Sequence, residues 1–184
     1  YHLGFDYLEF SLYGSHLLKK SHRDLYPRFG QTLFLSINQS LKNPTSFGGK
    51  TLAILNLYFP GVVPHHSTRL YFAHEKNKST THMLRPQASL PRGYYTDTMR
   101  YTDIFSGKFE YNFPFLYPDW SIGPIAYIKR FQASIFSDVA SIKYSQETGD
   151  TIFETESIFS FDATLAAEMN FLRFFIPFTP KITL

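Results

Sequence analysis

Apolar and polar residues alternate along most of this chain in segments of strand length. The clearest segment covers residues 105–115, where the odd-numbered positions are Phe105, Gly107, Phe109, Tyr111, Phe113 and Phe115. The positions between them are mostly polar. Because successive side chains of a β-strand point to opposite faces, this segment is predicted to be a strand with one apolar and one polar face. The recurrence of the pattern indicates a sheet whose apolar face is turned to lipid.

The alternation predicts eight strands. They cover approximately residues 2–18, 31–40, 50–59, 67–76, 105–115, 124–140, 156–169 and 171–184. Several of these segments exceed ten residues, whereas strands in soluble proteins average about 5–6 residues. A tilted strand that crosses a membrane needs about 9–11 residues. Strand length therefore favours a membrane barrel over the alternative that stays open, a soluble β-sandwich or jelly roll with an aromatic core.

The predicted connections differ in length in a regular way. Residues 77–103 and 145–155 are long and polar, whereas residues 117–120 and 169–170 form short turns. Since consecutive antiparallel strands reverse direction, both long connections fall at one end of the sheet and both short turns at the other. Transmembrane barrels have long external loops and short periplasmic turns. The sequence therefore predicts an all-β, antiparallel transmembrane barrel.

Composition agrees with this class. Aromatic residues make up 18% of the chain, yet the mean hydropathy is only −0.19. A helical membrane protein needs about 20 consecutive apolar residues, and the sequence contains no such run. One position departs from the pattern, because Lys129 falls in phase with the outward Tyr127 and Phe131. We expect its amine to reach the membrane interface near the turn at Asp119.

Several kinds of site have no support in the sequence. The chain has no cysteine, so it offers neither a disulfide nor a thiolate metal ligand. Its net charge is +3 and the basic residues are scattered, which gives no indication of nucleic-acid binding. Neither the pair His65 and His66 nor the group His16, His22 and Asp24 has the spacing of a closed metal shell. No nucleophile elbow occurs, so we expect no enzymatic activity, cofactor or metal.

Three local motifs follow one another along the chain. The first, residues 23–31, reads Arg-Asp-Leu-Tyr-Pro-Arg-Phe-Gly-Gln and contains Asp24, Pro27 and Gly30. The second, residues 90–94, reads Leu-Pro-Arg-Gly-Tyr and contains Arg92, Gly93 and Tyr94. The third, residues 136–140, reads Phe-Ser-Asp-Val-Ala and contains Asp138.

The phase of the strands brings two of these motifs into relation. Asp138 has the even-numbered phase of Arg130 and Gln132, which places its carboxylate on the inner face. Glu110 is inward on its own strand. Since a guanidinium binds a carboxylate through two parallel hydrogen bonds, both are candidate partners for Arg92.

Together and in this order, the three motifs resemble the BamA-type surface-antigen superfamily of outer-membrane barrels. In that family an Asp…Pro…Gly turn precedes a barrel strand, and an Arg-Gly-Phe/Tyr motif lies at the tip of a long loop folded into the lumen. A Phe-x-Asp-x-Gly element lies two strands further on, where this chain has Ala140 in place of the glycine. The resemblance implies that Arg92, Gly93 and Tyr94 form the lumen loop motif, held at the inner wall by Asp138. Within the superfamily, residues 111–130 look most like the large barrels of Bacteroidota.

The resemblance implies a bacterial outer-membrane protein that inserts or translocates outer-membrane proteins by a non-enzymatic route. Its implied partners are the lipid bilayer, client proteins, and periplasmic or lipoprotein accessory subunits. Two alternatives stay open. The barrel could only anchor or secrete a soluble N-terminal domain, or it could be a diffusive porin.

The resemblance also bears on how much of a barrel the chain holds. Family barrels have about 16 strands, and alignment on the Arg92 loop makes this chain strands eight to fifteen. An open eight-strand sheet would leave two unpaired edges in lipid, which a membrane does not tolerate. Residues 1–184 are therefore expected to be a partial barrel domain, a fragment of a longer chain.

Overall fold

The structure is a computed structural model of the chain. It describes residues 7–18, 24–41, 48–78, 86–94, 101–123, 125–148, 150–171 and 179–183, and for residues 144–154 and 171 it describes the backbone alone. All regular elements in these ranges are β-strands. The same ranges contain no helix that is long and apolar enough to cross a membrane.

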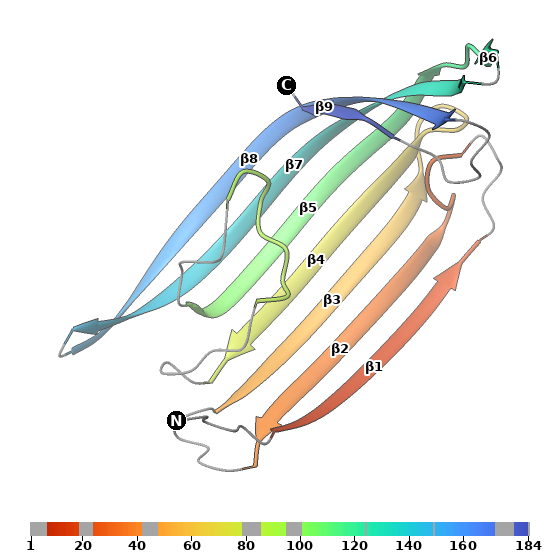
Figure 1. Ribbon diagram of the computed structural model, residues 1–184. Coiled ribbons are helices and arrows are strands. Elements are labelled where there is room, and N and C mark those ends of the chain that lie inside the picture. The colour runs from red at the N-terminus through yellow and green to blue at the C-terminus, as the bar shows by residue number, and fades with distance from the viewer. Residues whose placement is uncertain are drawn as a thin grey trace.

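The described strands form one antiparallel sheet (Figure 1). They are β1 (Tyr7–Leu17), β2 (Gly30–Ser40), β3 (Gly49–Pro60), β4 (Ser67–Asn77), β5 (Tyr101–Leu116), β6 (Trp120–Ile122), β7 (Ala126–Thr148), β8 (Asp150–Phe171) and β9 (Lys181–Thr183). Each strand pairs with the next along the chain, except that β5 pairs directly with β7 and the short β6 pairs with β7 alone. The prediction of an all-β, antiparallel sheet is confirmed. The sheet is curved but open, since β1 and β9 stand at opposite ends of the strand order.

The prediction of a long polar loop at residues 145–155 is wrong. β7 and β8 continue as a paired hairpin until Thr148 lies opposite Asp150. Most residues here are polar, and the apolar Ile152 and Phe153 are consecutive, so hydrophobic alternation ends although the backbone ladder continues. The hairpin does lie at the same end of the sheet as the connection between β4 and β5, as the strand directions predicted (Figure 1).

The prediction of a short turn at residues 169–170 is also wrong. β8 runs through both residues to Phe171, because the first residues of β7 provide partners for them, with Tyr127 opposite Asn170. Of the strand predicted at residues 171–184, the structure describes β9, which pairs with β8 at Thr164–Ala166. Residues 172–178 and residue 184 lie outside the described residues.

The compact turn predicted at residues 117–120 opens into a small hairpin. Trp120 of β6 lies opposite Ile128 of β7. The chain reverses with positive φ angles at Asp119 (47°) and Gly123 (53°), residue types that tolerate this left-handed region.

The outer face of the sheet carries exposed apolar side chains on β1, β2, β4, β5, β7, β8 and β9, as the alternation predicted. On β3 the outward side chains of Ala53, Leu55, Leu57 and Phe59 are half-buried. Phe10 of β1 is 72% exposed and Phe161 of β8 is 67% exposed. Register places these side chains on one face: Phe10 lies opposite Ile37, and Phe72 lies opposite Gly107. The set includes Leu8, Phe10, Leu12, Leu33, Ile37, Phe72, Phe105, Phe109, Ile135, Val139, Phe159, Phe161, Leu165 and Ile182.

The inner face is not uniformly polar, which the alternation did not predict. Residues 86–94, here called the inward segment, lie across this face over the middle strands (Figure 1). Ala88 and Leu90 of this segment pack on a patch of buried side chains that the inner face contributes. The patch consists of Leu52, Tyr71, Ala73, Tyr101, Ile104, Ala140, Ile142 and Ile158. The core of the described structure therefore lies between the sheet and its own long connection.

We predict that Ile104→Ala lowers the free energy of unfolding by about 2–5 kcal/mol, because it opens a cavity beneath the inward segment. Val139→Ala is the matched control, since Val139 lies on the outer face of the next strand and is 47% exposed. It should cost less than about 1 kcal/mol. Urea unfolding followed by far-UV circular dichroism measures both changes, and equal losses would contradict the assigned core.

Candidate functional site on the inner face

Glu75 of β4 attaches the first part of the inward segment to the sheet. Its Oε2 accepts hydrogen bonds from the main-chain nitrogens of Gln87 (2.9 Å) and Ala88 (2.7 Å). Its Oε1 accepts one from the Tyr101 hydroxyl (3.1 Å) and pairs with the Lys50 amine at 3.0 Å. Glu75 and Lys50 are both buried, so each charge requires the other to offset its loss of hydration.

Arg92 attaches the second part of the inward segment to strands β5 and β7. Its main-chain nitrogen donates to Asp138 Oδ2 at 3.1 Å, and its Nη2 lies 3.0 Å from Glu110 Oε2. The side-chain Nε is farther from Asp138, at 3.9 Å. The guanidinium also lies over the Phe136 ring, 3.5 Å from its centroid, which is within cation–π range.

The structure therefore brings together Arg92, Asp138 and Glu110, with the two carboxylates in different roles from those expected. The resemblance implied that Asp138 holds Arg92, and this contact is made mainly by the Arg92 main chain. The shorter side-chain ion pair of Arg92 is with Glu110.

Asp138 is fully buried, and a second cation offsets its charge. The Lys108 amine lies 3.7 Å from Asp138 Oδ2 and donates to Ser89 Oγ (2.8 Å) and to the Leu90 carbonyl. Lys108 thus joins the sheet carboxylate to the inward segment. The other oxygen, Asp138 Oδ1, is buried without a hydrogen-bond partner among the described residues.

The Arg-Gly-Tyr motif forms a tight turn. The Tyr94 nitrogen donates to the Pro91 carbonyl at 3.2 Å, and Gly93 has a φ of 90°. A positive φ at the third residue defines a type II turn, which favours glycine at that position. Gly93 is therefore explained by backbone geometry, and the Tyr94 side chain is 46% exposed.

The first motif forms a second attachment at the opposite end of the sheet. Asp24, which is almost fully buried, accepts a hydrogen bond from Arg28 Nε (3.2 Å) and lies 2.8 Å from His65 Nδ1. His65 belongs to the turn between β3 and β4, so the contact joins two connections. At Gly30 a Cβ would come within 2.9 Å of the His16 main-chain carbonyl oxygen, which explains glycine at the start of β2. Pro27 lies in the same connection.

Glu168 of β8 forms a third charged group. It pairs with Lys129 Nζ (3.0 Å) and with Arg130 Nε. The register between β7 and β8 shifts between Ile128 and Arg130, which lets two consecutive basic residues reach one carboxylate. The Lys129 amine thus pairs with a carboxylate of the neighbouring strand, and its place at a membrane interface stays a prediction.

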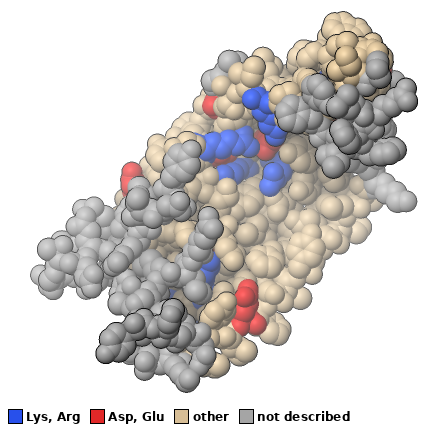
Figure 2. Space-filling view, viewed as in Figure 1, with Lys and Arg blue, Asp and Glu red and all other residues tan. Residues whose placement is uncertain are grey.

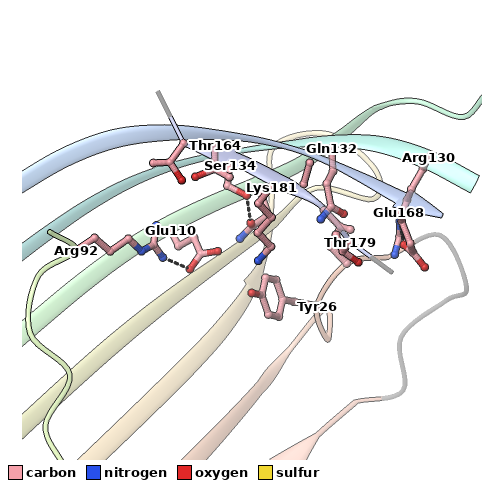
Figure 3. A pocket seen from close by; sticks show the side chains of 14 residues that line it. Tyr26, Arg92, Glu110, Arg130, Gln132, Ser134, Thr164, Glu168, Thr179 and Lys181 are labelled. Carbon is pink, nitrogen blue, oxygen red and sulfur yellow. Dashed lines mark hydrogen bonds and ion pairs between the residues drawn. The ribbon is translucent and has the colours of Figure 1, made fainter. Parts of the chain in front are cut away.

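A pocket of about 440 Å³ lies on the inner face (Figure 3). The charged side chains of Arg92, Glu110, Arg130 and Glu168 line it. Arg92 reaches its wall from one end of the sheet and Tyr26, in the connection between β1 and β2, from the other. Burial, with the nearby Glu110 carboxylate, raises the pKa of the Tyr26 phenol, which keeps it neutral. Figure 2 shows that Lys and Arg side chains gather on this face around a few carboxylates.

Some of these contacts had no signal in the sequence. The His65–Asp24 pair joins residues 41 positions apart, and nothing local marks either as the partner of the other. Glu168 and Lys108 had a detectable signal, because both fall in the inward phase of their strands. Within the described residues, no three His, Asp or Glu side chains gather as a metal shell would require.

Comparison with protein-family models, with curated proteins and with solved structures gives no match to this chain.

We predict that Asp138→Ala lowers the free energy of unfolding by about 3–5 kcal/mol, because it leaves the partly buried Lys108 amine and the Arg92 nitrogen without their carboxylate. Asp162→Ala is the matched control, since Asp162 lies on the inner face of β8 and, within the part of the chain that the structure describes, bonds only to the next main-chain nitrogen. It should cost less than about 1 kcal/mol. Urea unfolding compares the two variants, and a similar small loss for both would show that Asp138 does not hold the segment.

Proposed function

We propose that this chain forms part of the wall of a transmembrane β-barrel in a bacterial outer membrane. The observation that carries the proposal is the exposed apolar face, which extends from Phe10 on β1 to Ile182 on β9. Soluble monomers rarely expose continuous apolar patches larger than about 300–600 Å². A lipid-facing apolar surface with a polar interior is the arrangement of transmembrane barrels.

The two edges of the sheet support a barrel larger than the described strands. All eleven residues of β1 are exposed, and β9 covers only three residues of the edge of β8. Unpaired backbone groups at these edges would be costly in lipid. We therefore infer that further strands complete the wall.

For the role of the barrel, we infer participation in the insertion or translocation of outer-membrane proteins, as in the BamA-type superfamily that its motifs resemble. The supporting observation is the inward segment, which is attached to the inner wall through Glu75, Asp138 and Glu110. A barrel that only anchors a soluble domain would also benefit from such an attachment. Membrane insertion and insertase activity therefore need separate tests.

The membrane proposal predicts an alternating accessibility along β8 in liposomes. Because the chain has no native cysteine, spin labels can be attached to single cysteines introduced at residues 159–165. We expect odd positions such as Phe161 to be accessible to oxygen, which dissolves in lipid. Even positions such as Thr164 should instead be accessible to a water-soluble nickel complex. A soluble sheet would leave the odd positions open to the nickel complex as well.

The insertase proposal predicts faster folding of a client barrel. The full gene product that contains this chain, reconstituted in liposomes, should accelerate folding of an unfolded outer-membrane protein several-fold over empty liposomes. Heat-resistant migration in gels measures the folded client. Arg92→Ala should reduce the acceleration, whereas Lys143→Ala, which alters an exposed lysine of β7 away from the inward segment, should not. Folding as slow as in empty liposomes, with the spin-label pattern intact, would favour the anchor.

A further inference from the structure

The pocket on the inner face has the features of a ligand site. Its volume of about 440 Å³ falls within the usual range for small-molecule sites. Among the described residues, Leu25 and Ala166 alone contribute aliphatic side chains to its wall. We propose that this pocket binds an oxyanion, the phosphate or carboxylate group of a polar solute. The proposal depends on the pocket itself and not on the membrane assignment.

The described lining of the pocket carries more positive than negative charge. Arg92, Arg130 and Lys181 line the pocket with two carboxylates, Glu110 and Glu168. Each of these carboxylates already faces more than one cation. Glu168 pairs with both Lys129 and Arg130, while Glu110 pairs with Arg92 and lies 3.9 Å from Arg69. An added anion would balance this charge.

Lys181 places an amine in the pocket. It extends from β9 into the pocket, where its amine lies toward Tyr26 (Figure 3). Among the residues that the structure describes, no carboxylate pairs with it. A lysine amine in a partly enclosed polar site is a strong binding group for a phosphate or carboxylate.

The pocket wall also contains a buried hydrogen-bond donor, the side-chain amide of Asn112. Asn112 is 4% exposed and lines the pocket. Its Oδ1 accepts a hydrogen bond from Ser134, but its Nδ2 has no partner among the described residues. Since a buried donor left unpaired is costly, an oxygen of a bound anion at this place would restore the lost bond.

The lining also indicates the source of the oxyanion. Hydroxyl groups of Thr164, Thr179 and Thr183 complete the wall, and these suit a hydroxylated solute. A lipid would need an apolar surface for its acyl chains, and the extended apolar surface lies on the opposite face of the sheet. The polar and positively charged lining of the pocket therefore fits a soluble phosphorylated or carboxylated polyol.

Calorimetric titration of the full gene product in micelles of an uncharged detergent tests the proposal. The probes are glucose 6-phosphate, inorganic phosphate, glucose and a short-chain phosphatidylglycerol. We expect saturable binding of glucose 6-phosphate and weaker binding of phosphate, with none of glucose. Lys181→Gln should weaken binding about tenfold or more, the loss of one charge-assisted hydrogen bond.

Two variants separate recognition from folding. Asn112→Asp keeps the side-chain shape but replaces the donor with a negative charge, so it should abolish binding. Lys143→Gln alters an exposed lysine outside this pocket and should leave the affinity unchanged. Binding of phosphatidylglycerol alone, lost in Lys181→Gln, would keep the oxyanion site and assign it to a lipid headgroup. Absence of saturable binding, or equal affinities in Lys181→Gln and the unaltered protein, would overturn the proposal.

Discussion

Two buried carboxylates determine how the interior of this sheet is organised. Glu75 and Asp138 are both fully buried, and each accepts main-chain hydrogen bonds from the inward segment. A buried ionised carboxylate is costly unless cations and donors surround it. Lys50 and Lys108 supply the cations, and the inward segment supplies the donors. The long connection must therefore lie on the inner face, and its position allows Ala88 and Leu90 to cover the apolar patch beneath them.

The division between the two faces follows from strand register. A shift of one residue in any strand pair would turn every side chain of one strand to the opposite face relative to its partner. Such a shift between β5 and β7 would move either Glu110 or Asp138 to the face that Phe109 and Ile135 now occupy. The cost of exposing these charges to an apolar surface, together with the loss of the inner contacts, makes the observed register strongly preferred. The same division gives the protein a surface suited to lipid and an interior suited to ions and water.

The interior is occupied from both ends. Arg92 approaches Glu110 from one end and Tyr26 approaches the same region from the other, so the pocket lies between two connections. The first is attached to the sheet through Glu110, and the second to the turn between β3 and β4 through Asp24. In the barrel that we propose, an interior occupied in this way differs from the wide aqueous channel of a diffusive porin. The two connections leave between them a small polar site where, among the described residues, positive charge exceeds negative.

The sequence by itself determined most of the long strands, their two faces and the inward phase of Glu110 and Asp138, because side-chain alternation depends only on the local backbone. It did not determine the hairpin at Thr148 and Asp150 or the extension of β8 to Phe171, since these depend on a partner strand that continues where hydrophobic alternation does not. It marked Arg92 by its turn, but which carboxylate would take the guanidinium was decided only by the tertiary structure. The tertiary structure also decided the pairing of His65 with Asp24 and the apolar patch under Leu90. These contacts join segments that are distant in sequence, and only the folded path of the chain brings them within bonding distance.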